Sequence, residues 1–176
     1  IGNLTELRKL EVGGTHITSV PDALNKLTHL EFFDIMDTPV TVLPKDMSQL
    51  IHLKYVDIDE TAVVDVSPLV GLPIQRLIAD YNEGIQIDTI AQHTTLKELS
   101  LSGCFITSIP KDFANLQSLV KLNLSNNQLT TVSGLKSPLR HVRQLSLAKN
   151  QLTDSAADIQ KLFPYASIAG LKLTAK

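Results

Sequence analysis

A chain of 176 residues that is 43% apolar and 19% charged falls in the range of ordinary globular domains and is long enough to bury a core. Its formal net charge of -2 creates no overall field that would attract nucleic acid or an anionic membrane. The single cysteine, Cys104, excludes an intrachain disulfide, and no apolar run approaches the roughly 18 residues of a membrane span. We expect one domain without membrane insertion, whose electrostatic preferences are local.

A pattern of apolar residues recurs along the chain. Residues 119–130, LVKLNLSNNQLT, fit the template LxxLxLxxNxL at every fixed position. The first apolar position of this template recurs every 21 to 26 residues, at Leu7, Leu30, Leu53, Ile74, Leu96, Leu119, Val142 and Ile168. Self-similarity at such a period predicts a solenoid in which each turn contributes one strand to a parallel sheet.

Within each repeat the apolar residues alternate with polar ones, as in a strand that buries one face. The fourth and sixth template positions are predicted to point inward, from Leu10 and Val12 in the first repeat to Leu171 and Leu173 in the eighth. The third, fifth and seventh positions are predicted to point outward. Eight such strands would present their outward residues side by side on one concave face.

The ninth template position is where each turn leaves its strand. Asparagine suits this position, because its side chain can donate and accept hydrogen bonds between buried backbone groups of adjacent turns. Asparagine is found there at Asn82, Asn127 and Asn150. The other turns carry Thr15, Thr38, Thr61 and Cys104. We therefore predict a looser ladder in the N-terminal half, and a structural role for the buried cysteine in place of a catalytic one.

Proline opens several of the return segments that follow the strands. Proline costs no hydrogen bond at the first position of a helical turn, so Pro21, Pro44 and Pro110 predict short helical returns. A longer helix is predicted over residues 155–163, where it could cover the end of the core.

The fourth repeat breaks the rhythm. Ala79 replaces a large inward residue, and Gly84 takes the next apolar slot, with Ile85 and Ile87 displaced beyond it. We expect a bulge or an altered loop there, which is either a tolerated irregularity or a recognition loop beside the concave face.

Over essentially its whole length the chain resembles the leucine-rich repeat superfamily. The segments TVLPKDMSQL and TSIPKDFANL are similar to the Ras-suppressor-like type, GGTHITSVP and MDTPVTVLP to plant intracellular immune receptors, and VVDVSPLVGL to bacterial internalin-like surface proteins. The resemblance implies an α/β fold, a right-handed horseshoe solenoid with a parallel sheet on the concave face and short helical or irregular returns on the convex face. We expect residues 1–176 to form a single domain of about seven repeats and a partial last one, within a longer protein.

In each of these families the repeat domain binds another protein and is not itself the catalyst, so the resemblance implies a non-catalytic interaction module. The sequence agrees, since it contains no Gly-rich phosphate loop, HExxH, CxxC or GxSxG motif. We predict no enzyme activity and no cofactor. The alternatives are a recognition arm of a larger enzyme effector or immune receptor, and a spacer. The mixture of repeat types favours a bacterial surface or effector protein.

Aromatic and charged side chains share the outward positions of the first four repeats. Phe32, Tyr55 and Arg76 occupy the third template position on successive strands, and Asp34 and Asp57 occupy the fifth. Exposed aromatic residues beside charges are typical of an interface anchor. The predicted partner-binding residues are Phe32, Asp34, Tyr55, Asp57, Asp59, Arg76 and Asp80.

Charge is distributed unevenly along the predicted concave face. The first four repeats hold Glu11, Glu31, Asp34, Asp37, Asp57, Asp59, Glu60 and Asp80 against Arg8, Lys9, Lys54 and Arg76. Later repeats hold Lys97, Lys121, Arg143, Lys149 and Lys172 against Glu98. We predict an acidic N-terminal half and a basic C-terminal half, and a protein or peptide partner with a basic, partly apolar epitope.

Two metal hypotheses compete with this interpretation. Clustered carboxylates such as Asp34, Asp57 and Asp59 could hold a calcium ion, although they lack the glycine and the tight spacing of a calcium loop. His29 and His52 hold the same phase in adjacent repeats, but a zinc site needs three or four ligands and no cysteine lies near. We therefore predict no metal site.

Overall fold

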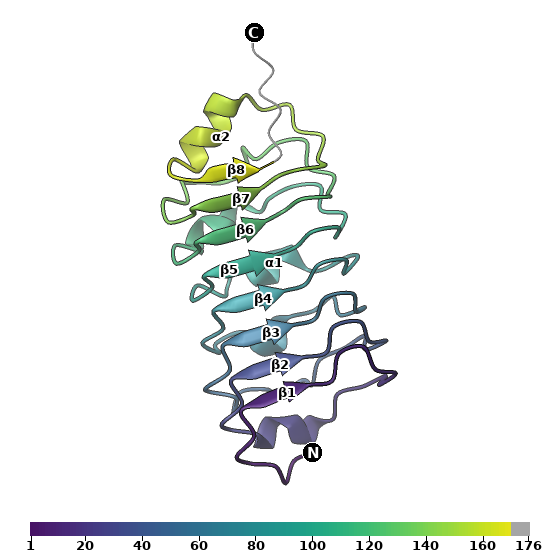
Figure 1. The fold of residues 1–176 in the computed structure, drawn as a ribbon. Helices are drawn as coiled ribbons and strands as arrows, with labels where there is room; N and C mark the ends of the chain where they lie inside the picture. The colour runs from purple at the N-terminus through teal and green to yellow at the C-terminus, as the bar shows by residue number, and fades with distance from the viewer. Residues whose placement is uncertain (170–176) are drawn as a thin grey trace.

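The structure is a computed structural model that describes residues 1–169, a solenoid whose turns stack along one axis (Figure 1). Each turn contributes one strand to a parallel sheet in which neighbours in sequence are neighbours in space. The strands are β1 (Lys9–Glu11), β2 (Phe32–Asp34), β3 (Tyr55–Asp57), β4 (Arg76–Ile78), β5 (Glu98–Ser100), β6 (Lys121–Asn123), β7 (Gln144–Ser146) and β8 (Ser167–Ala169). This architecture confirms the predicted leucine-rich repeat solenoid.

The alternation of side chains is also confirmed. Phe33, Ile35 and their equivalents in the next turns are buried, whereas the residues on either side of them face the open side of the sheet. In the first seven strands the register is the predicted one, with Phe32 opposite Tyr55 and Tyr55 opposite Arg76. A parallel in-register stack therefore places equivalent outward residues in columns that cross the strands.

The eighth strand differs from its prediction. Ile168 lies opposite Leu145, so it is the inward strand residue and not the equivalent of Val142. By this register the first template position is Tyr165, which is exposed, while Phe163 fills the core with no exposed surface. The sequence spacing of aliphatic residues missed this exchange of an aliphatic anchor for an aromatic one. The predicted inward pair Leu171 and Leu173 lies outside the described residues.

The returns are short and mostly of 3-10 type. They comprise η1 (Asp22–Lys26), η2 (Ser67–Leu69), α1 (Ile87–Ile90), η3 (Lys111–Asn115) and α2 (Ala156–Leu162). Pro21 and Pro110 precede η1 and η3 as predicted. The prediction for Pro44 is wrong: the Oδ1 of Asp46 accepts a hydrogen bond from Ser48 N at 3.0 Å, and this local turn replaces a helix.

The predicted C-terminal helix is confirmed as α2, capped by Ser155, whose side chain accepts a hydrogen bond from Asp158 N. The irregularity of the fourth turn is confirmed as well. Gly84 adopts a left-handed backbone with a φ of 80°, and Ile85 is buried one residue later than in regular turns. Helix α1 follows this loop.

Asparagine forms the predicted ladder between turns. The Oδ1 of Asn127 accepts hydrogen bonds from Cys104 N and Ile106 N, both at 3.0 Å. Its Nδ2 donates to Leu101 O at 2.7 Å and to Leu124 O at 3.1 Å. The hydroxyls of Thr15, Thr38 and Thr61 each donate to the carbonyl three residues earlier in their own turn. The ladder thus binds adjacent turns together more firmly at asparagine than at threonine.

The residue before the ladder position has a left-handed backbone in each of the first seven turns, a feature that was not predicted. These residues are Gly14, Asp37, Glu60, Tyr81, Gly103, Asn126 and Lys149. Glycine is required at position 103 for two reasons. Its φ is 71°, and a Cβ atom would lie 2.6 Å from Cδ1 of the Tyr81 ring. In the second and third turns this left-handed residue is acidic, Asp37 and Glu60.

Candidate functional site

Two aromatic rings stack across strands β2 and β3 on the concave face. The ring centroids of Phe32 and Tyr55 are 6.1 Å apart, with the planes tilted by 37°. The Nζ of Lys9 lies 4.8 Å from the Phe32 centroid, and the guanidinium of Arg76 lies 5.4 Å from the Tyr55 centroid. Both aromatic residues are half-buried, so the column of cation, two rings and cation keeps part of its apolar surface open to a partner.

Beside this column runs a row of carboxylates, defined here as the acid row: Asp34, Asp57, Asp59 and Asp80. Asp34 lies directly opposite Asp57 in the sheet. One oxygen of Asp34 accepts a hydrogen bond from Met36 N, and one of Asp57 accepts from Asp59 N. These bonds stabilise the turn after each strand and fix the side chains where like charges face one another.

The acid row has no ion-pair partner within residues 1–169, whereas Glu11, Glu31 and Glu98 of the same face each bind a base. Glu31 binds Arg8 at 2.6 Å and Lys54 at 3.3 Å, and these bonds lower its pKa. Glu98 binds Arg76 at 2.8 Å and Lys121 at 3.8 Å. These bases thus pair with glutamates at the second and third template positions, and none of them pairs with the acid row.

Asp59 experiences the strongest conflict in the acid row. Burial, followed by the charges of Asp80, Asp57 and Glu60, raises its pKa to about 6 from 3.8. Its Oδ1 is shielded from solvent and has no hydrogen-bond partner in the described part of the chain. The pKa of Asp57 is also raised, by burial first and then by Asp34 and Asp80, against the bond from Asp59 N. A cation bound beside the acid row would offset the repulsion between these carboxylates.

Replacing Asp59 with asparagine is expected to stabilise the protein at neutral pH. Because the folded state raises the pKa, it disfavours the carboxylate above pH 6 and gains stability as the pH falls from about 6 towards 3.8. At pH 7.5 the free energy of unfolding of Asp59→Asn should therefore be about 1 kcal/mol higher than that of the wild type, a value reduced for the partial solvent exposure of Asp59. Urea unfolding at pH 7.5 and at pH 4 measures it, and the difference should vanish at the lower pH. An equal difference at both pH values would mean that the charge is not the cause.

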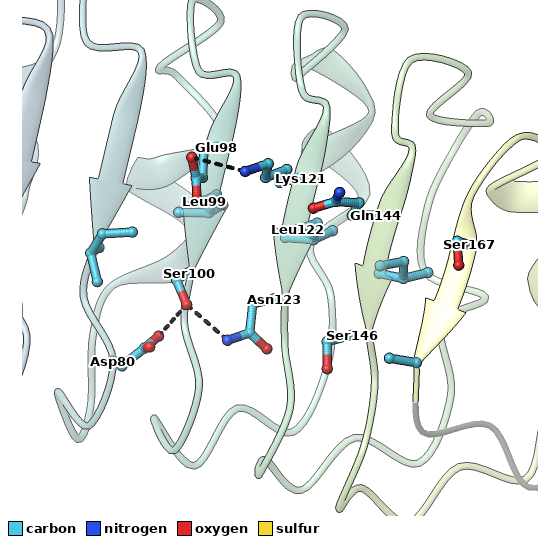
Figure 2. Close-up of a pocket in the computed structure, with 13 residues that line it drawn as sticks. Asp80, Glu98, Leu99, Ser100, Lys121, Leu122, Asn123, Gln144, Ser146 and Ser167 are labelled. Carbon is cyan, nitrogen blue, oxygen red and sulfur yellow. Dashed lines mark hydrogen bonds and ion pairs between the residues drawn. The ribbon is translucent and has the colours of Figure 1, made fainter.

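A hollow of 590 Å³ opens in the concave face over strands β4 to β8 (Figure 2). Glu98, Lys121, Gln144 and Ser167 line one side, and Asp80, Ser100, Asn123 and Ser146 line the other. From β5 to β8 the fifth template position carries the short side chains of Ser100, Asn123, Ser146 and Ala169, which leave room for the hollow. Sequence reasoning missed Ser100, Asn123 and Ser146, although the run of small polar residues at one template position was a usable signal.

Five of the seven predicted partner-binding residues line two adjoining recesses. Phe32, Tyr55, Asp57 and Arg76 line a smaller recess of 170 Å³. Asp80 lines the hollow, and Asp34 and Asp59 line neither of these two recesses. Ile78 and Glu98 belong to both linings, so the recesses are continuous.

The hollow itself holds few of the bases predicted for the C-terminal half of the concave face, because Lys97, Arg143 and Lys149 lie outside its lining. Lys121 is the only predicted base among the lining residues of the hollow in the described chain, and Glu98 pairs with it. Lys172 lies outside the described residues. Because the outward strand positions there carry serine, asparagine and glutamine, the floor is mostly neutral and hydrogen-bonding.

The histidines and the cysteine add no chemistry to this face. His29 and His52 stack with ring centroids 6.1 Å apart, as expected from their equivalent positions in adjacent repeats. No group of three or more His, Cys, Asp or Glu residues within residues 1–169 is arranged to hold a metal ion. Burial is the main cause that raises the pKa of the Cys104 thiol to about 11, so it is unsuited to act as a nucleophile at neutral pH. None of the described helices is both long and apolar enough to span a membrane.

Comparison with known proteins points to one repeat family. Residues 94–152 match the sequence model described as leucine rich repeat. An internalin from Listeria monocytogenes is 25% identical with a TM-score of 0.71, and the match covers 98% of this chain and 56% of the internalin. A leucine-rich repeat protein from Leptospira interrogans is 24% identical with a TM-score of 0.68, over 95% of this chain and 50% of its own.

A third similar structure is that of the TLR13-ssRNA13 complex, with a TM-score of 0.79 and 20% identity over 98% of this chain and 26% of that chain. At such identities the last two likenesses concern the fold alone. Comparison with curated proteins gave no match. This chain spans about half the length of the two bacterial proteins.

Proposed function

Because the chain is a leucine-rich repeat solenoid, we propose that it is a non-catalytic interaction module that binds a basic, partly apolar segment of another protein. The binding surface is the concave face over β2 to β4, formed by Phe32 and Tyr55 with the acid row beside them. Arg76 belongs to this surface as the residue that holds the Tyr55 ring. The leucine-rich repeat fold is commonly a protein-interaction module, which agrees with a binding role.

The acid row without ion-pair partners is the observation that carries the proposal. Like charges on neighbouring strands destabilise a sheet, and Asp34 and Asp57 are in direct register. A lysine or arginine from a partner that lies along the acid row would neutralise this charge. The neighbouring rings offer apolar surface, which is the usual composition of an energetic centre in an interface.

The similarity to the TLR13-ssRNA13 complex raises RNA as a second class of ligand. The charge of this concave face opposes it, since nucleic-acid binding draws its affinity from basic groups that neutralise phosphates. Here the bases Arg76 and Lys121 are occupied by Glu98, and the acid row would repel a phosphate backbone. A polypeptide with positive charge is therefore the favoured partner. The similarity to an internalin from Listeria monocytogenes supports a bacterial setting for this proposal.

Two pools of short labelled peptides test the proposal. One pool alternates lysine or arginine with varied apolar residues, and the other has glutamate at the charged positions. We expect the wild type to bind the basic pool, with an affinity that falls as salt rises. Asp34→Asn/Asp57→Asn should weaken this binding about tenfold.

The matched control is Asp112→Asn, which removes one acidic charge on η3, where Asp112 pairs with Lys136. It should leave peptide binding unchanged. Equal binding of the basic and acidic pools, or an Asp34→Asn/Asp57→Asn protein that binds as well as the wild type, would overturn the proposal. A structured RNA of mixed sequence serves as a third probe, and its preferential binding would also contradict a basic peptide partner.

A further inference from the structure

We propose that the hollow over β4 to β8 is a subsite for an arginine side chain of the partner, with Asp80 as its anchor. The inference rests on the proposed function and specifies which basic residue is selected and where it binds. It depends on the fixed orientation of Asp80, on the charge balance of the hollow, and on the small side chains that line it.

Asp80 is held in place from the neighbouring strand. Its Oδ1 accepts a hydrogen bond from Ser100 Oγ at 2.6 Å and another from Ser102 N at 2.6 Å. Ser100 Oγ in turn accepts from Asn123 Nδ2 at 2.9 Å, so the carboxylate is the end of a chain of bonds along one side of the hollow (Figure 2). Both bonds end on Oδ1, and Oδ2 receives none from any described residue. The carboxylate is therefore oriented before a ligand arrives, with one oxygen left for it.

The charge balance of the hollow calls for a cation at Asp80. Of the two acidic residues in the lining, Glu98 already binds both Arg76 and Lys121. Asp80 has no base within ion-pair distance in the described chain. A positively charged group that enters beside Asp80 would meet one unpaired carboxylate and no free base of the lining.

The shape and chemistry of the lining favour arginine over lysine. Ser100, Asn123 and Ser146 are short, so a flat group can lie against this side of the hollow (Figure 2). Asn123 Oδ1 already accepts hydrogen bonds from Ser125, but the side-chain oxygens of Gln144, Ser146 and Ser167 receive none from any described residue, in addition to Oδ2 of Asp80. A guanidinium group presents five donors in a plane and can satisfy several separated acceptors at once, whereas an ammonium group is a compact, strongly hydrated charge.

The hollow is also in reach of a partner bound to the aromatic column. Ile78 and Glu98 line both the hollow and the smaller recess that contains Phe32 and Tyr55. One extended segment that lies on the rings can therefore continue across β4 and place its next basic residue at Asp80. This continuity with the proposed binding surface identifies the occupant as the same basic polypeptide.

Paired peptides that differ only in arginine or lysine at every basic position test the inference by fluorescence anisotropy. We expect the wild type to bind the arginine peptides about tenfold more tightly. Asp80→Asn should abolish this preference, although the asparagine keeps Oδ1 as an acceptor for Ser100 and Ser102. Ser100→Ala should reduce the preference while binding persists, because Ser100 acts by positioning Asp80.

A second variant tests the hollow without altering Asp80. Ser146→Trp fills the space and should lower the affinity for arginine peptides more than for lysine peptides, while Asp112→Asn changes neither. Equal affinity for arginine and lysine peptides, or a preference that survives Asp80→Asn, would overturn the subsite. If basic peptides bind with the expected dependence on Asp34 and Asp57 but without arginine preference, only this inference fails. If no basic peptide binds, the proposed function fails with it.

Discussion

Asn127→Ala is expected to lower the free energy of unfolding by about 3–4 kcal/mol, because it leaves several buried backbone groups without hydrogen-bond partners at once. The side chain of Asn127 satisfies the N–H groups of Cys104 and Ile106 and the carbonyls of Leu101 and Leu124. Alanine can replace none of these bonds, and the site is too buried for water to do so freely. Urea unfolding followed by circular dichroism measures the loss.

Thr38→Val is the matched control for the asparagine ladder. It removes one hydrogen bond, from Thr38 Oγ1 to Ile35 O, at the same template position two turns before the first ladder asparagine. We expect it to cost about 1 kcal/mol. Losses of equal size at Asn127 and Thr38 would show that the asparagine does not tie the turns together. Because stability in a solenoid sums over neighbouring turns, Asn127→Ala should also separate the unfolding of the two halves.

Most of the fold was predictable because its information is local and repeated. A period of two within each strand and of about 23 residues between strands determines which side chain faces inward and which strand it pairs with. Tyr165 shows the limit of this reasoning. An exposed tyrosine stands at an anchor position because Phe163, at the end of α2, fills the core in its place. No count of aliphatic residues could reveal that exchange.

The candidate site was predictable in composition and only partly in arrangement. Strand register is enough to predict that Phe32 lies beside Tyr55 and that Asp34 lies opposite Asp57. The structure confirms both pairs. The distribution of ion pairs was not accessible, because it depends on side-chain reach. Glu31 attracts Arg8 and Lys54 away from the acid row, although a tally of charges gives no such distinction. The hollow was not predicted, because a single serine or asparagine on the open face of a strand indicates nothing and only their run at one template position does.

The second large effect concerns the aromatic column. Phe32→Ala/Tyr55→Ala should weaken binding of the basic peptide pool at least about tenfold, because the two rings supply the apolar centre of the surface. The variant should stay folded, since both rings are half-buried on the open face. Phe33→Ala is the opposite case. Phe33 has no exposed surface, and its loss should cost about 3–5 kcal/mol of stability.

Titration of one selected basic peptide against the wild type and Phe32→Ala/Tyr55→Ala, at a temperature where both are folded, is the most direct measurement. Val42→Ala, which shortens an exposed apolar side chain away from the strands, serves as the control and should bind as the wild type does. The proposal predicts that only the aromatic variant loses affinity, about tenfold or more. A titration in which that variant binds as tightly as the wild type would contradict recognition through the concave face.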